Sequence, residues 1–306
     1  MKMTLSFIRV PQLAAAAALL TVAVTSAAAE GTFDRTVTAD PRGSVEISNV
    51  AGKLVITGWD KPEVAVHAEL GPGVERVDLL SSGGRTIVKV VLPSMSFRDG
   101  DTDLEVHVPK QSEVQATAVS ADLETSNLLG EQRLRTVSGA LRAAFAGGAD
   151  FEAKTVSGDM RLRGAAAQPG TLRLGTVSGD IIVNGGAGEV EATSVSGDVR
   201  LEMQAASSVR LHSTSGDLTF RGALTEGGSI EAETMSGDVT LRPRAPGGFD
   251  YEATSFSGNI GNCFDQEAVA TSRHGPGSRL TGSAGEGKGG RVRVKTMTGD
   301  IDVCDH

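Results

Sequence analysis

The sequence predicts an all-β fold: a single-stranded parallel β-solenoid of the right-handed β-helix type, with an N-terminal β cap. A five-residue pattern, Thr-Val-Ser-Gly-Asp, recurs with variations about every twenty residues through the C-terminal two thirds of the chain. Apolar and polar residues alternate on both sides of each copy, which is typical of strands with one buried face. Glycine is frequent, at 39 of 306 residues, and aromatic residues make up only 4%. Many tight turns and a thin aliphatic core explain both deviations.

The first residues have the pattern of a signal peptide. Lys2 and Arg9 give a positively charged start, residues 13–24 form a short apolar run, and residues 27–29 are three alanines that fit a cleavage site. No cysteine follows that site directly, and no later apolar run is long enough for a membrane span. We therefore expect residues 1–29 to be removed and the mature protein to be exported, to the periplasm or outside the cell.

Residues 30–108 lack the repeat and are predicted to form the β cap. They contain several short runs of β-branched residues with alternating polarity, most of them bounded by turn residues. Residues 49–54 resemble a weak copy of the repeat corner. A repeat array needs a cap because an open end leaves unpaired backbone groups and an apolar cross-section.

Residues 109–306 are predicted to form the solenoid, with a glycine at the corner of each rung. The residues two and four after each glycine are apolar with few exceptions, as are those seven and five before it, so these positions should face inward. The same alternation predicts that the Thr or Ser residues three and one before the glycine also face inward. A glycine with one extra residue lets a strand bend. The expected corner glycines are Gly139, Gly158, Gly179, Gly197, Gly216, Gly237, Gly258 and Gly299.

Residues 262–289 interrupt the repeat and are predicted to form a long surface loop. Cys263 and Cys304 each lie five residues after a corner glycine, so they share one position of the repeat. If the interruption completed a rung, the cysteines would be about 9.6 Å apart, beyond the reach of a disulfide. If it loops out, they lie on adjacent rungs about 4.8 Å apart. The shared position and an oxidising compartment favour the second geometry and predict the disulfide Cys263–Cys304.

The repeated Thr-x-Ser-Gly-Asp corner, behind a signal peptide and a short β cap, resembles the bacterial putative-adhesin β-strand-repeat family. The resemblance covers roughly residues 44 to 306 and depends on the Ser-Gly-Asp corners. It implies an exported or envelope protein that contains a domain of unknown function. It supplies no catalytic residues, because the adhesin label is an analogy at the level of the fold.

Two rows of residues near the corners are candidates for binding. The Asp after each glycine should form a column that could hold a divalent cation. Hydrogen bonding of each carboxylate to a turn N–H is favoured instead, because one carboxylate per rung supplies too few ligands for a cation. The residue two before each glycine should point outward and form an apolar stripe, which is typical of an interaction site. Burial of this stripe under the return loops is favoured over an exposed interaction site. The candidate interaction stripe is Val156, Val177, Val195, Met235, Phe256 and Met297.

No catalytic, cofactor or metal site is predicted. The five histidines have no metal-ligand spacing, and no nucleophile elbow, His-Glu-x-x-His or phosphate-loop motif occurs. A net charge of −9 argues against nucleic acid, which needs clustered Lys and Arg. We therefore predict a non-enzymatic, adhesin-like structural or interaction module of the cell envelope, whose partner is an envelope protein or a glycan. The alternative is a polysaccharide-active β-helix enzyme or a glycan-binding module.

Overall fold

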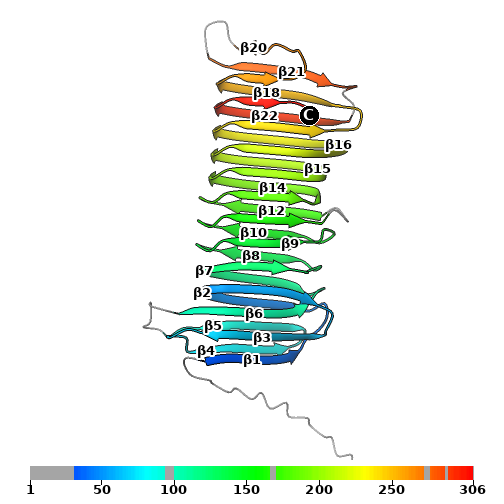
Figure 1. Cartoon of the computed structure of the whole chain (residues 1–306). Coiled ribbons are helices and arrows are strands. Elements are labelled where there is room, and N and C mark those ends of the chain that lie inside the picture. Colours follow the sequence, from blue (N-terminus) through cyan, green and yellow to red (C-terminus); the bar gives the residue numbers. More distant parts are fainter. Residues whose placement is uncertain (1–30, 94–99, 166–169, 272–275, 287–288, 306) are drawn as a thin grey trace, which may run out of the picture.

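The computed structural model describes residues 31–93, 100–165, 170–271, 276–286 and 289–305. Within these ranges hydrogen bonds join 23 strands into one continuous sheet, and no helix is formed. The strands are stacked one above another into an elongated body (Figure 1). An all-β fold with mainly parallel strands is therefore confirmed. The predicted signal peptide, residues 1–29, lies outside the described residues.

Each rung of the stack consists of a first strand, a glycine corner and a second strand. First strands pair in parallel with first strands and second strands with second strands, so that Ala153 lies between Leu134 and Leu174. The first strands include β8 (Gln132–Thr136), β10 (Phe151–Thr155), β12 (Gly170–Thr176) and β14 (Ala187–Ser196). The second strands include β9 (Leu141–Phe145), β11 (Met160–Gly164) and β13 (Ile181–Gly185). Three longer strands contain two halves each: β7 (Glu113–Ser126), β15 (Val199–Ser215) and β16 (Leu218–Ser236).

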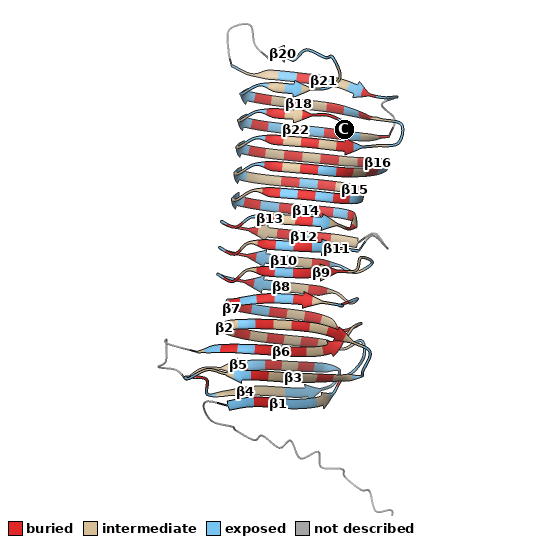
Figure 2. Ribbon diagram, viewed as in Figure 1, coloured by how far each residue is buried: buried red, intermediate tan, exposed pale blue. Residues whose placement is uncertain are grey.

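The core lies between the first strands and the second strands, and Figure 2 shows buried residues alternating with exposed ones along them. In one rung, Leu172, Leu174 and Thr176 of β12 and Ile181 and Val183 of β13 are all buried. These are the positions that the period-two pattern assigned to the interior. Aliphatic side chains of successive rungs therefore form one continuous core along the stack.

The expectation that the residue just before each corner glycine also faces inward is wrong. Ser157 and Ser178 are exposed, like the valines that precede them. Because two successive residues face outward, the alternation of the strand ends before the glycine. The bend therefore begins one residue earlier than predicted. The inward serine or threonine of each corner is the one three before the glycine.

Stacking order and chain order differ near the C-terminus. The strands concerned are β17 (Val239–Arg244), β18 (Phe249–Ser257), β19 (Ile260–Asn262), β22 (Gly290–Thr298) and β23 (Ile301–Val303). Strand β22 pairs in parallel with β16 on one side and with β18 on the other, and β23 lies between β17 and β19. The last rung in the sequence is thus inserted between the two rungs that precede it, and Figure 1 shows β22 between β16 and β18.

Antiparallel strands close both ends of the stack. The N-terminal strands are β1 (Gly31–Thr38), β2 (Ser44–Trp59), β3 (Glu63–Leu70), β4 (Arg76–Ser82), β5 (Arg85–Val91) and β6 (Asp101–Pro109). Strand β2 is itself a rung, because it pairs in parallel with β7 on both sides of Gly52. Strands β1 and β3, β3 and β6, and β4 and β5 pair antiparallel. The boundary between a cap at 30–108 and repeats at 109–306 stays a prediction.

At the other end, the stretch predicted as a loop contains two strands, β20 (Val269–Ala270) and β21 (Ser278–Ala284). Strand β21 pairs antiparallel with β18 and buries Leu280 and Ala284. Reading the whole of 262–289 as loop is therefore wrong, because part of it covers the open edge and the end of the core. The described residues include no helix with the length and apolar character needed to cross a bilayer.

Candidate interaction surface

The corner glycines set the closest approach between rungs. A Cβ on Gly179 would overlap the carbonyl oxygen of Gly158, and one on Gly197 would overlap that of Gly179. Neither of these glycines has a positive φ in the left-handed region, whereas Gly216 and Gly237 have φ of 151° and 141°. Contact with the neighbouring backbone is therefore the requirement that the corners share.

At the first corners, inward-facing threonines accept hydrogen bonds from the corner glycines. The N–H groups of Gly158 and Gly179 donate to the Oγ1 atoms of Thr155 and Thr176, at 2.9 and 3.0 Å. From Gly197 onward the corner N–H donates instead to a carbonyl of the next rung. Because these hydroxyls are turned into the stack, they are not available to an external glycan.

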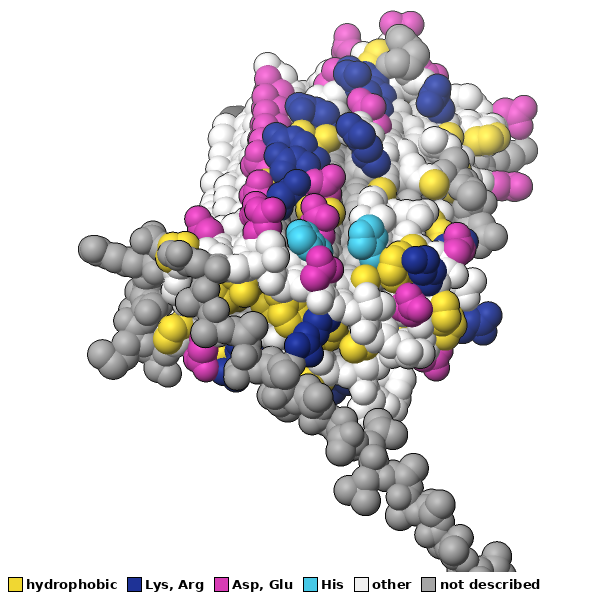
Figure 3. All heavy atoms as spheres, turned by 60° about the horizontal axis from the view of Figure 1, so that its bottom comes forward, with side chains coloured by type: hydrophobic (Ala, Val, Ile, Leu, Met, Phe, Trp, Pro, Cys, Tyr) yellow, Lys and Arg dark blue, Asp and Glu magenta, His cyan; other side chains and the backbone are white. Residues whose placement is uncertain are grey.

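The column of aspartates joins successive rungs. The N–H of Asp198 donates to Oδ1 of Asp180 at 3.0 Å, and the N–H of Asp217 donates to Oδ1 of Asp198 at 2.9 Å. The series continues through the inserted rung, because Asp300 donates to Asp238 and Asn259 donates to Asp300. Figure 3 shows acidic side chains in a column along one edge of the stack. Each acceptor carboxylate in this column binds a backbone donor from the neighbouring rung, not from its own turn.

No group of three or more potential metal-ligating side chains occurs among the residues that the structure describes. The aspartate column has a structural explanation in its own contacts, namely backbone hydrogen bonding between rungs.

The apolar stripe is exposed, so the expectation of its burial under the return loops is wrong. Val156, Val177 and Val195 have relative exposures of 45%, 46% and 46%. At the C-terminal end of the stripe, Met235, Met297 and Phe256 are exposed by 57%, 55% and 54%. Val119 and Val137 extend the row toward the N-terminus, and Thr214 is its one polar member. We call this row, from Val119 to Phe256, the apolar ladder.

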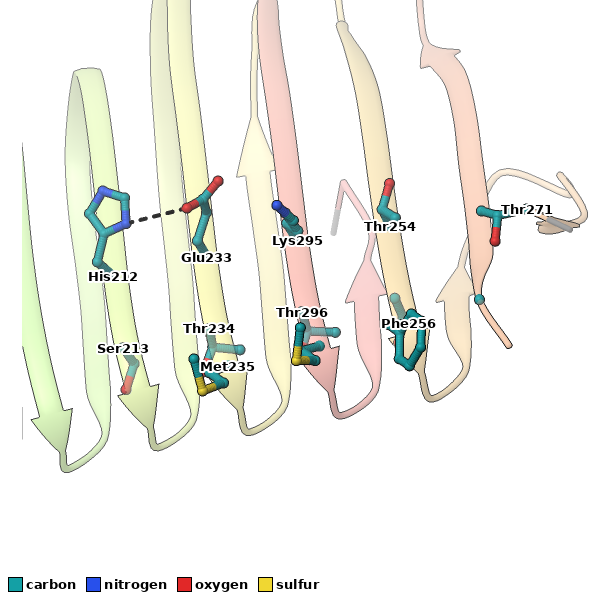
Figure 4. A pocket seen from close by; sticks show the side chains of 13 residues that line it. His212, Ser213, Glu233, Thr234, Met235, Thr254, Phe256, Thr271, Lys295 and Thr296 are labelled. Carbon is teal, nitrogen blue, oxygen red and sulfur yellow. Dashed lines mark ion pairs between the residues drawn. The ribbon is translucent and has the colours of Figure 1, made fainter. Parts of the chain in front are cut away.

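The C-terminal end of the apolar ladder borders a groove of about 440 Å³. Met235 of β16, Met297 of β22 and Phe256 of β18 contribute its apolar surface, and Thr271 and Gly277 complete its lining next to β18. Figure 4 shows the labelled residues of β16, β22 and β18 on neighbouring strands, with Met235 and Phe256 among them.

A row of polar residues lies in the groove two positions before the apolar ladder. Nδ1 of His212 is 3.9 Å from Oε2 of Glu233, and Lys295 follows on the next strand. Within the described residues, Lys295 has no carboxylate at ion-pair distance. The alternating pattern could identify these residues as outward-facing. The groove itself was not predicted, because it depends on the inserted rung and on Thr271 and Gly277, which lie outside the repeat.

The fold and this surface define an all-β repeat protein that exposes a row of mostly apolar residues along its corners, interrupted at Thr214. The model of the family called Toastrack DUF4097 matches residues 76–223 and 206–304, and the chain belongs to this family.

Similarity to solved structures is weak. A putative adhesin from Parabacteroides distasonis ATCC 8503 is 12% identical, with 89% of this chain and 97% of that chain covered and a TM-score of 0.44. A putative adhesin from Bacteroides fragilis NCTC 9343 is also 12% identical, with coverages of 90% and 97% and a TM-score of 0.35. A putative lipid binding protein from Parabacteroides distasonis ATCC 8503 is 12% identical, with coverages of 89% and 96% and a TM-score of 0.28. Similarity this low assigns no ligand. Comparison with curated proteins found no significant match.

Proposed function

We propose that the protein is an exported, non-catalytic, right-handed β-solenoid that works as an adhesin-like interaction module of the bacterial cell envelope. The observation that carries this proposal is the apolar ladder. It runs over nine successive rungs, which at the spacing of paired strands corresponds to a length of about 38 Å. Apolar residues on the surface of a soluble protein usually occur singly, whereas a long row of them, here interrupted only at Thr214, marks a surface that a partner covers.

The chemistry of the ladder favours an envelope protein over a glycan as the partner. Valine, methionine and phenylalanine present no hydrogen-bonding groups, whereas a sugar needs donors and acceptors for its hydroxyls. A protein with its own row of apolar side chains can cover the ladder without leaving hydrogen-bonding groups unpaired. The stack holds the row straight, because each rung is hydrogen bonded to the next on both strands.

Two observations support export. The sequence begins with the pattern of a signal peptide, and Cys263 and Cys304 form a disulfide with a Cα–Cα distance of 5.2 Å. Disulfides persist mainly in oxidising compartments such as the periplasm. A catalytic role gains no comparable support, because the aspartates that line the corner edge are engaged in backbone hydrogen bonds between rungs.

The test is capture from an envelope extract by the immobilised mature protein. A ladder variant carries Val156→Ser, Val177→Ser and Val195→Ser. A control variant carries Arg161→Ser, Ile182→Ser and Arg200→Ser, which lie on the second strands of the same rungs. We expect the wild type and the control to retain the same proteins and the ladder variant to lose them. Equal retention by all three, or turnover of an acidic polysaccharide by the wild type, contradicts the proposal.

A further inference from the structure

The C-terminal end of the apolar ladder differs from the rest in size and flexibility. Val156, Val177 and Val195 are small and stiff, whereas Met235, Met297 and Phe256 are large and more than half exposed. These three side chains are consecutive only because the rung of β22 is inserted between β16 and β18. Methionine has an unbranched, polarisable side chain that adapts to the shape of an apolar ligand.

The groove beside these three residues has the dimensions of a small-molecule site. Its volume of about 440 Å³ falls within the roughly 300–1,000 Å³ of typical ligand pockets. The methionines and the phenylalanine line it on neighbouring strands, Thr271 lies at the end of this row beyond Phe256, and Gly277 completes the lining. The valine part of the apolar ladder does not line this groove.

The charges in the groove specify the polar part of the ligand. Lys295 precedes Met297 by two residues on β22, and among the described residues no carboxylate lies within ion-pair distance of its Nζ. Glu233, its neighbour on β16, lies beside His212 instead. The groove thus places a lysine ammonium beside an apolar surface, with Glu233 as its cross-strand neighbour but not at ion-pair distance. A cation beside an apolar surface is complementary to an anionic head on an apolar chain.

The backbone around the groove excludes an added peptide strand. Strands β16, β22 and β18 each pair with a neighbour on both sides, so their N–H and C=O groups are already used. A peptide that binds by adding a strand needs a free edge. A hydrocarbon chain needs no backbone partner, and its affinity grows with the apolar area that it covers.

We propose that this groove binds a long-chain carboxylate of the fatty-acid class. The acyl chain lies along Met235, Met297 and Phe256, and the carboxylate pairs with Lys295. The proposal deepens the interaction role proposed above, because it names the ligand of the C-terminal end of the same apolar ladder.

The test measures binding of monomeric tetradecanoate and of its methyl ester by calorimetry, together with shorter acids of the same series. For the wild type we expect saturable binding of the acid, with affinity rising about twofold to fourfold for each added CH₂. Lys295→Gln should weaken acid binding about twofold to fivefold, as for a partly exposed ion pair, and leave ester binding unchanged. Met235→Ser combined with Met297→Ser should weaken both by about tenfold or more.

Matched control variants come from the repeat itself. Lys154 and Val156 occupy the positions of Lys295 and Met297 in another rung, outside the groove. Lys154→Gln and Val156→Ser should bind both probes as the wild type does. All the substituted side chains are exposed, so a cooperative unfolding transition verifies that each variant remains folded.

The proposal is overturned if monomeric tetradecanoate does not saturate the protein, or if Lys295→Gln weakens acid and ester equally. Binding only to phosphatidylglycerol vesicles also overturns it and assigns the surface to a membrane. None of these outcomes affects the envelope-capture test, because that test substitutes valines outside the groove.

Discussion

Single residues at the corners decide how closely two rungs approach. Any side chain on Gly197 meets the carbonyl of Gly179 in the neighbouring rung. We expect Gly197→Val to lower the free energy of unfolding by well over ~1 kcal/mol, which is the ordinary entropic difference for a glycine. Gly175→Ala is the control, because its Cβ would meet only Lys154 Cγ at 3.6 Å. Equal melting temperatures for Gly197→Val and the wild type would remove the corner assignment.

One corner lacks the side chain that joins it to the next rung. Ala140 donates its N–H to Oδ1 of Asp122 at 2.9 Å, but offers no oxygen to the N–H of Asp159. Ala140→Asn supplies that acceptor, and we expect it to stabilise the protein by about 0.5–1.5 kcal/mol in urea unfolding. Ala140→Asp should gain less, because its charge lies between two carboxylates. A loss of stability in Ala140→Asn would show that the side-chain acceptor does not strengthen the contact between rungs.

The carboxylate of Glu152 gives the stability a dependence on pH. Hydrogen bonding by Lys154, followed by that of Arg135, holds the pKa of Glu152 below its ordinary value of 4.5. A carboxylate with a lowered pKa stabilises the fold above its unfolded-state pKa, and that contribution is lost as pH falls through the folded-state pKa. We expect Glu152→Gln to cost up to about 1 kcal/mol at neutral pH and less at about pH 3, which lies below the ordinary pKa of 4.5. Urea unfolding at both pH values checks this, and a cost independent of pH would contradict it.

Among the strands, charge alternation favours the position of the inserted last rung. The middle outward residues of successive first strands alternate in sign, in the stacking order Arg133, Glu152, Arg173, Glu191, Arg210, Glu231, Arg293 and Glu252. Chain order would place Glu231 directly beside Glu252. The inserted strand β22 puts Arg293 between them, with Nε 3.6 Å from Oε2 of Glu252. Cross-strand pairs of opposite charge are favourable, and like charges directly opposite are not.

Charge reversal of Arg293 tests this explanation. Arg293→Glu places three acids in a row across β16, β22 and β18, and we expect it to destabilise the fold by about 1–2 kcal/mol. Arg200→Glu is the control, because its direct neighbours Ile182 and Thr219 carry no charge. Thermal unfolding at low salt measures both. An equal effect of the two substitutions would mean that alternation contributes nothing to the position of β22.

Over the whole molecule, the disulfide secures the inserted rung. Cys263 follows β19 and Cys304 follows β23, and these two strands pair directly. The prediction of a disulfide between adjacent rungs is confirmed, although the Cys304 rung lies on the inner side of the Cys263 rung. Cys304 is buried, so the bond also contributes to the edge of the core.

Removing this bond should loosen one end of the stack selectively. For a loop closed over 41 residues, the chain-entropy estimate is roughly 4 kcal/mol as an upper figure. We expect Cys263→Ser combined with Cys304→Ser to speed hydrogen exchange in β19, β22 and β23 and to leave β8 to β13 protected. Mass spectrometry of the unreduced mature protein provides the control. Two free thiols, or faster exchange along the entire stack, would contradict this prediction.

The sequence by itself determined the structure of a single rung, namely which of its residues face the core. Period-two alternation placed Leu172, Leu174, Ile181 and Val183 in the core, because a strand with one buried face must alternate. The same pattern pointed the residues of the apolar ladder away from the core, but only the structure showed that no return loop covers them. Shared positions within the repeat also predicted the pairing of Cys263 with Cys304.

Only the tertiary structure decided which rung lies beside which other rung in the stack. Parallel pairing uses the same backbone hydrogen bonds in every rung, so the repeat fits several neighbours almost equally well. The choice depends on side chains distant in sequence, such as Arg293 between Glu231 and Glu252. Their alternation becomes visible only when the register is known. The groove shares this origin, because Met235, Met297 and Phe256 become neighbours only through the inserted rung.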